Sequence, residues 1–202
     1  MYAFLRRHPT RPFRRPQGGL GRVLNRIALA ITKIKRESGL PTATVSQMPK
    51  KIQARKSTIH GNGVFALAPI KKGERVIQYK GLLRSHADVD ADDTGDVESG
   101  HTFLFTLNDD YVIDANYKGN DARWLNHSCD PNCEAVIEEA EGDNRREDKV
   151  FIEAIKDIKP GDELTYNYGI TLAERHTARL KKIWECRCGS KKCTGTMLQP
   201  KR

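Results

Sequence analysis

The sequence has no long hydrophobic run: no stretch approaches 18 consecutive apolar residues, and the mean hydropathy is −0.64. A membrane-spanning helix needs about 20 such residues, which excludes a multi-span membrane protein. A secretory signal is also missing, because the one apolar run near the N-terminus, residues 27–31, is short and is flanked by Arg26 and Lys33. We therefore expect a soluble, intracellular protein with no membrane partner.

Cysteine is absent from the first 128 residues, and five cysteines follow. An odd number clustered late in the chain does not suit a disulfide framework and favours a metal site in a reducing compartment. The spacing Cys186-x-Cys188-x4-Cys193 supplies three soft ligands, and a tetrahedral zinc needs a fourth. The residues themselves leave Cys129 and Cys133 as the two candidates.

Acidic residues are almost absent from residues 1–50, which hold one, Glu37, against 11 Lys or Arg. The whole chain holds 35 Lys plus Arg and 26 Asp plus Glu, so the net charge of +9 belongs to this part. We expect residues 1–49 to be a disordered basic leader, with a transit peptide or a nucleic-acid tether as alternatives. Met48 is an alternative start. Beyond the leader the composition gives no general case for nucleic-acid binding.

The remaining chain consists of short β segments separated by turns that contain glycine. The expected strands cover residues 76–79, 102–107, 111–114, 150–155 and 164–168. Thr171-Leu172-Ala173-Glu174 has the form of a capping box, which predicts one late helix that runs to Trp184. The predicted fold class is mainly β.

Two motifs imitate sites that the surrounding residues exclude. Residues 61–66 fit a dinucleotide fingerprint, but Pro69 and Gly73 prevent the helix that must follow. What remains is a tight turn that a ligand can approach closely. The acidic residues 88–98 begin like a calcium loop, but its sixth and twelfth positions are Asp93 and Ser99. We interpret this stretch as a solvated loop or as a surface for a Lys/Arg-rich peptide.

Four further motifs occur in a fixed order along the chain. They are Gly61-Asn62-Gly63, Tyr79-Lys80-Gly81, Asn126-His127-Ser128-Cys129 and Glu163-Leu164-Thr165-Tyr166-Asn167-Tyr168. On these motifs the sequence, from about residue 52 to residue 198, resembles SET-domain protein lysine methyltransferases that carry a zinc-binding post-SET segment. The resemblance implies a β-rich fold of small sheets with a pseudoknot over residues 50–170. A helix and the post-SET segment would follow over residues 171–202. Asn167 departs from the pattern, since many relatives have Asp there.

The resemblance also implies the site residues. The backbone of Gly61, Asn62, Gly63 and Phe65 would hold S-adenosylmethionine, and Arg123, Asn126 and His127 would complete that pocket. Tyr168 would stand at the point of methyl transfer, while Tyr79, Phe103 and Tyr166 would line the lysine channel. Cys129, Cys186, Cys188 and Cys193 would bind a structural Zn2+, leaving Cys133 as a free thiol.

The implied activity is protein-lysine N-methylation, which needs little beyond alignment of the reacting atoms and exclusion of water. Because Tyr166 carries a hydroxyl, we expect mono- or dimethylation to dominate. The expected partner is a protein or peptide with a target lysine, and a basic segment would suit it. We expect a monomer, located in the cytoplasm of a bacterium or the nucleus of a eukaryote. The alternative is a catalytically inactive SET module that acts as a peptide-binding adaptor.

Overall fold

The computed structural model describes residues 50–92, 103–142, 144–172 and 175–200. The basic leader therefore lies outside the described residues, as do Ala173 and Glu174 and most of the acidic stretch. Within the described part the elements follow the order β1 (Ile52–Lys56), β2 (Asn62–Ala66), β3 (Arg75–Tyr79), β4 (Leu82–Ser85), α1 (His86–Ala91), β5 (Leu104–Thr106), β6 (Tyr111–Asp114), η2 (Asp121–Trp124), β7 (Asn126–His127), β8 (Cys133–Glu138), η3 (Arg145–Glu147), β9 (Lys149–Ala154), β10 (Glu163–Tyr166) and α2 (Ala178–Ile183).

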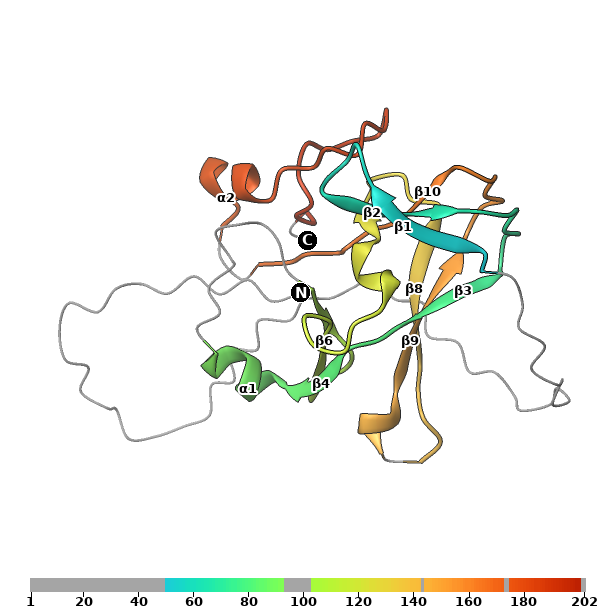
Figure 1. Cartoon of the computed structure of the whole chain (residues 1–202). Helices are drawn as coiled ribbons and strands as arrows, with labels where there is room; N and C mark the ends of the chain where they lie inside the picture. The colour runs from blue at the N-terminus through green and yellow to red at the C-terminus, as the bar shows by residue number, and fades with distance from the viewer. Residues whose placement is uncertain (1–49, 93–102, 143, 173–174, 201–202) are drawn as a thin grey trace, which may run out of the picture.

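These strands form three small sheets, as the β-rich fold class predicts (Figure 1). One sheet has the order β1-β2-β10-β7, the second β3-β9-β8 and the third β4-β6-β5. Strand β10 pairs antiparallel with β2 and parallel with β7, so a strand from late in the chain lies between two earlier ones. This insertion brings the turn before β2 next to the segment around Asn126.

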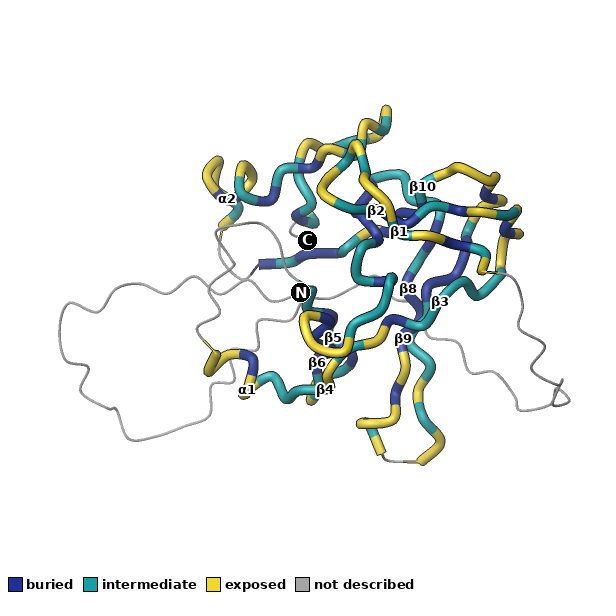
Figure 2. The backbone as a smooth tube through the Cα atoms, viewed as in Figure 1, coloured by how far each residue is buried: buried dark blue, intermediate teal, exposed yellow. Residues whose placement is uncertain are grey.

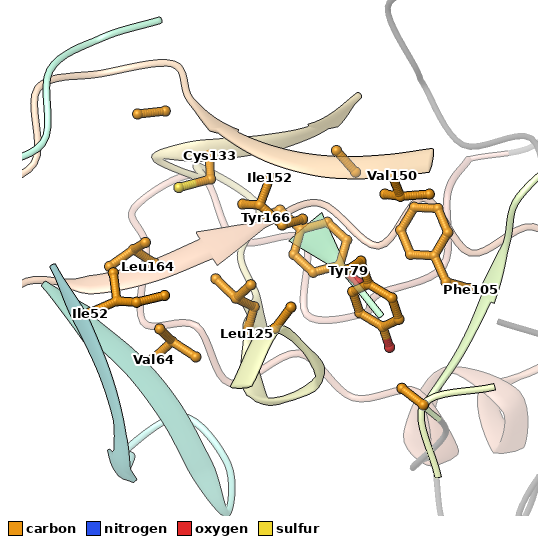
Figure 3. Packing of buried hydrophobic residues seen from close by; sticks show 14 of the residues in the cluster. Ile52, Val64, Tyr79, Phe105, Leu125, Cys133, Val150, Ile152, Leu164 and Tyr166 are labelled. Carbon is orange, nitrogen blue, oxygen red and sulfur yellow. The ribbon is translucent and has the colours of Figure 1, made fainter. Parts of the chain in front are cut away.

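The core takes buried residues from all three sheets. Val64 of β2 and Leu164 of β10 are paired and fully buried, and Ile152 of β9 is also fully buried (Figure 3). Figure 2 shows buried segments along β8, β9 and β10, whereas much of α1 and α2 is exposed. A second, smaller cluster gathers Ile170, Leu172, Leu180, Trp184 and Leu198, and Tyr168 contacts both clusters.

The predicted late helix is present but shorter than its sequence pattern indicated. Thr171 and Leu172 are not helical, and α2 begins after the N-cap Thr177, whose hydroxyl accepts a hydrogen bond from the Leu180 N–H at 3.2 Å. The prediction of a start at Thr171 is therefore wrong. The cause is tertiary, because the backbone of Ile170 forms a bridge with Leu198 and holds the chain extended there.

The start of the acidic stretch also differs from the expected loop. Residues 86–91 form α1, whose N-cap Ser85 exchanges hydrogen bonds with Asp88 in a capping box. The two described α-helices have six residues each, and no described helix is long and apolar enough to span a membrane.

Candidate functional site

The turn before β2 places the first motif against β10. Gly61 has a φ of 48°, a conformation that favours glycine, and its carbonyl accepts the Ser57 N–H at 3.1 Å. A side chain at Gly63 would collide with the Glu163 carboxylate, so only glycine fits at this close approach. Phe65 is half-buried, and the Arg55 guanidinium lies 3.9 Å from the centre of its ring.

Asn126 connects this turn to two other strands. Its buried amide nitrogen lies 3.0 Å from the Asn62 carbonyl oxygen, 3.2 Å from that of His60 and 2.8 Å from the Glu163 carboxylate. The Glu163 carboxylate also accepts the Ser57 hydroxyl at 2.8 Å. Glu163 is therefore a structural anchor.

Arg123 is held on η2 beside two aromatic rings. Its guanidinium donates to the Ala115 carbonyl at 3.2 Å and lies 4.4 Å from the Trp124 ring centre and 5.5 Å from that of Phe103. The Phe103 ring packs edge-on against Trp124 with centroids 5.1 Å apart. The Phe103 carbonyl in turn accepts the Tyr79 hydroxyl at 3.3 Å.

Four aromatic side chains from three strands and a loop converge at the core. This aromatic cluster consists of Tyr79, Phe105, Tyr166 and Tyr168. Ring centroids are 5.1 Å apart for Tyr79 and Phe105, 6.5 Å for Phe105 and Tyr166, and 4.9 Å for Tyr166 and Tyr168. Figure 3 shows three of these rings side by side. Phe105 lies within an expected strand, but no sequence motif marks it as a site residue.

The phenol groups of this cluster stay protonated. Burial raises the pKa of Tyr79, Tyr166 and Tyr168 well above the usual value, and the Glu163 charge adds to the effect on Tyr168. The cluster therefore provides neutral rings and hydroxyl groups in an environment with little water. No phenolate is available there to act as a base.

Tyr168 is fixed by two hydrogen bonds. Its hydroxyl donates to the carbonyl of the buried Leu125 at 2.8 Å, and its backbone N–H donates to Nδ1 of His127 at 3.1 Å. Burial lowers the pKa of His127 to about 4, so the ring is neutral at physiological pH. The structure thus brings His127 and Tyr168 together, although 41 positions separate them.

The cysteine cluster, formed by Cys129, Cys186, Cys188 and Cys193, has its four sulfurs within 4.8 Å of one another. Burial on its own would raise the pKa of the Cys188 thiol, but hydrogen bonds with the backbone of Cys129 and Ser190 lower it to about 6. Such a thiol readily supplies a thiolate ligand.

Cys133 lies outside the cysteine cluster. It is fully buried on β8, and burial raises the pKa of its thiol to about 12. Of the two cysteines that the spacing left open, the structure brings Cys129 to the other three.

Comparison with known proteins agrees with this arrangement. The SET domain family model matches residues 61–169, which is more than half of the chain. The chain belongs to the SET-domain family. The match covers the turn at Gly61, the block at Asn126, Tyr166 of β10 and Tyr168 after it.

The chain is similar to three curated proteins over most of its own length. It is 36% identical to a Candida albicans protein named histone-lysine N-methyltransferase, H3 lysine-4 specific, over 75% of this chain and 14% of the relative. It is 37% identical to the Schizosaccharomyces pombe protein of the same name, over 72% of this chain and 15% of the relative. Histone-lysine N-methyltransferase trithorax of Drosophila virilis is 36% identical over 68% of this chain and 3% of its own length. The SET-domain chain thus spans a small part of these relatives.

The cysteine cluster fits a zinc ion. Four sulfurs at the usual Zn–S distance of about 2.3 Å stand about 3.8 Å apart in a tetrahedron. The sulfurs of Cys129 and Cys186 are 3.7 Å apart, close to this value. Four soft ligands are also the donor set typical of a structural zinc site.

The second core cluster has a feature that suits a bound polar molecule. Trp184 is fully buried, yet its indole N–H has no hydrogen-bond partner among the described residues. Buried donors are almost always paired in native proteins. Tyr168 packs against this same cluster, so the unpaired indole N–H is a donor that a polar group of a small-molecule cofactor would satisfy.

Proposed function

We propose that the chain is a protein-lysine N-methyltransferase that uses S-adenosylmethionine. The observation that carries this proposal is the aromatic cluster, which stands directly beside the family's Asn126-His127 segment through the bond between His127 and Tyr168. When bound, the cofactor supplies a methyl group already activated by its sulfonium charge. The domain boundaries proposed are 50–170 for the SET domain and 171–202 for the zinc-binding segment.

The cofactor pocket proposed consists of Gly61, Asn62, Gly63, Phe65, Arg123, Asn126 and His127. The contacts of the Asn126 amide nitrogen with the His60 and Asn62 carbonyls support it, because they fix the backbone of the turn that would face the cofactor. The stacking of Arg123 on Trp124 leaves that side chain little freedom. A preformed pocket lowers the entropy lost on binding.

The lysine channel proposed is lined by Tyr79, Phe103, Tyr166 and the added Phe105. A free lysine has a pKa of about 10.4, so most of it carries a proton at neutral pH and cannot attack a methyl group. An apolar aromatic channel favours the neutral amine, since burial disfavours the charged form. Tyr168 would orient the amine, and its bond to Leu125 supports this role by fixing the hydroxyl.

A basic protein segment is the substrate class that the charge distribution supports. Residues 51–172 hold 15 Lys or Arg and 23 Asp or Glu, whereas residues 173–202 hold nine and two. An acidic domain around the channel attracts a Lys-rich peptide. The relatives' names suggest histone H3 as one candidate substrate, in which case the protein would act in the nucleus of a eukaryote. In a bacterium the substrate would be another basic protein, and the protein would act in the cytoplasm.

The test is methyl transfer by the full chain loaded with zinc. The chain is incubated with S-adenosylmethionine and a panel of Lys-containing peptides, including the N-terminal segment of histone H3, and products are identified by mass spectrometry. A 14 Da increase on lysine supports the proposal. Tight binding of a peptide without any transfer would reject it in favour of the peptide-binding adaptor.

A further inference from the structure

The two ring nitrogens of His127 contact two different groups, a backbone N–H and a cysteine sulfur. The side chain is buried on β7, and its Nδ1 accepts the Tyr168 N–H at 3.1 Å. A backbone N–H can only donate, so Nδ1 carries no proton and the neutral ring has its hydrogen on Nε2. That Nε2 lies 3.6 Å from Sγ of Cys129, one of the four sulfurs of the cysteine cluster.

The His127 ring accepts a hydrogen bond just beyond the point where the backbone pairing of β7 with β10 ends. The two strands run parallel, and the Ser128 N–H donates to the Tyr166 carbonyl at 3.1 Å. Strand β10 ends there, and the next donor two residues on, the Tyr168 N–H, meets the His127 ring instead of a backbone carbonyl. The edge of the imidazole packs against the Tyr168 ring, with centroids 5.3 Å apart and planes at 70°.

We propose that His127 is a positioning residue whose ring joins a zinc-bound Cys129 thiolate to the backbone of Tyr168. The inference rests on the proposed function and on the proposed zinc site. A thiolate is a stronger acceptor than a thiol, so the Nε2–H donates to it and the tautomer with a free Nδ1 is favoured. That free Nδ1 is the acceptor that Tyr168 requires. Filling of the cysteine cluster therefore fixes the tyrosine at the transfer point.

Three substitutions in the full zinc-loaded chain test the contact with the Cys129 sulfur and the contact with the Tyr168 N–H separately. His127→Asn places an amide oxygen where Nδ1 stands but cannot reach the sulfur. His127→Gln places an amide N–H near the position of Nε2 but leaves the Tyr168 N–H without its acceptor. His127→Leu removes both. The matched control is His86→Gln, because His86 stands at the start of α1 and its Nε2 lies 2.9 Å from the Asn108 carbonyl oxygen, outside both the cysteine cluster and the aromatic cluster.

The first readout is independent of methyl transfer. We expect His127→Asn and His127→Leu to release zinc to a chelator roughly tenfold faster than the unmodified chain, and His127→Gln to stay close to it. The thiolate-to-metal absorption band of the cobalt-substituted chain should shift in the same two variants. Zinc release and a cobalt band unchanged in His127→Leu would overturn the proposal. The control should change neither quantity.

The second readout concerns Tyr168. We expect His127→Gln to lower kcat with little change in the KM for the peptide, because the ring acts through the tyrosine and not on the substrate. If the variants do not fold, nitrogen-15 NMR of the unmodified zinc-loaded chain decides. A ring protonated at Nε2 supports the inference, and one protonated at Nδ1 overturns it. This measurement does not depend on methyl transfer, so it distinguishes failure of this inference from failure of the proposed function.

Discussion

The side-chain amide of Asn126 donates to the carboxylate of Glu163 at 2.8 Å. The same nitrogen lies within hydrogen-bonding distance of two carbonyl groups in the turn before β2. One side chain therefore connects its own strand to two segments, which lie 37 and up to 66 positions from Asn126 in the sequence. All three partners are oxygen acceptors, so the position requires a donor.

Replacement of Asn126 by Asp tests this requirement. The change preserves the shape of the side chain but places a buried carboxylate among three oxygen atoms, which we expect to lower the free energy of unfolding by about 3 kcal/mol. Affinity for S-adenosylmethionine should fall as the turn loses its anchor. Urea unfolding and calorimetric titration of the full chain measure the two effects.

The matched control for that variant is Asn167→Asp. Oδ1 of Asn167 only accepts, from the Gly169 N–H and the Gln199 amide, both at 2.9 Å, and an aspartate keeps both bonds. Its unfolding free energy should stay within about 0.5 kcal/mol of the unmodified value, which is usual for an exposed site. Equal losses in the two variants would show that Asn126 has no special role.

Tyr168→Phe should lower turnover about 100-fold while leaving cofactor affinity nearly unchanged. The substitution removes the hydroxyl that we propose orients the reacting groups, and misplacement of this kind has such an effect on rate. Stability should fall by about 1 kcal/mol, because the Leu125 carbonyl loses its donor at 2.8 Å. Tyr117→Phe is the control, since that side chain is 55% exposed. Steady-state kinetics that show full turnover in Tyr168→Phe would remove this residue from the site.

Metal analysis of the purified chain should find one zinc ion per molecule. Cys188→Ser removes one of four ligands, so the metal and the methyltransferase activity should both be lost. The control is Cys133→Ala, because this thiol is fully buried and a serine hydroxyl there would lack a partner. Its cost in stability should be about 1 kcal/mol with the zinc content unchanged. Loss of zinc from Cys133→Ala would contradict the ligand assignment.

Half of the ten described strands could be predicted from β-branched and aromatic residues in the sequence, namely β3, β5, β6, β9 and β10. The expected strand over residues 111–114 is β6, and that over residues 150–155 differs from β9 by one residue at each end. Strand β1 was missed because Gln53, Arg55 and Lys56 are polar, and it is a strand because it pairs with β2. Whether such a polar segment forms a strand depends on pairing with a partner strand, which the local composition does not indicate.

The candidate site residues could be named from motifs, but their connections could not. Polar and sulfur-containing residues occur together in short segments, and these segments drew attention to Asn126, His127 and the cysteines. Phe105 was missed, since an aromatic residue in a strand is usually a core residue and no motif distinguishes it. The bond between His127 and Tyr168 depends on the parallel pairing of β7 with β10, which only the fold supplies.

The last prediction concerns the number of methyl groups added and depends on Tyr166. This residue is 8% exposed and lies between Phe105 and Tyr168 in the aromatic cluster. In the proposed lysine channel its hydroxyl would hold a water molecule, which a methylated amine would have to displace. Displacement of a well-held water by a methyl group is unfavourable by about 1–2 kcal/mol, or roughly tenfold in rate.

We therefore expect the unmodified chain to stop mainly at mono- or dimethyllysine, and Tyr166→Phe to shift the product toward a higher state while the first methylation proceeds at a similar rate. Time-resolved mass spectra of one peptide measure the ratio, with Tyr117→Phe as the control. If Tyr166 serves only as a core aromatic, Tyr166→Phe should change the unfolding free energy and leave the product ratio as it was. Abundant trimethyllysine from the unmodified chain would contradict the assignment directly, because the hydroxyl would then not restrict the channel.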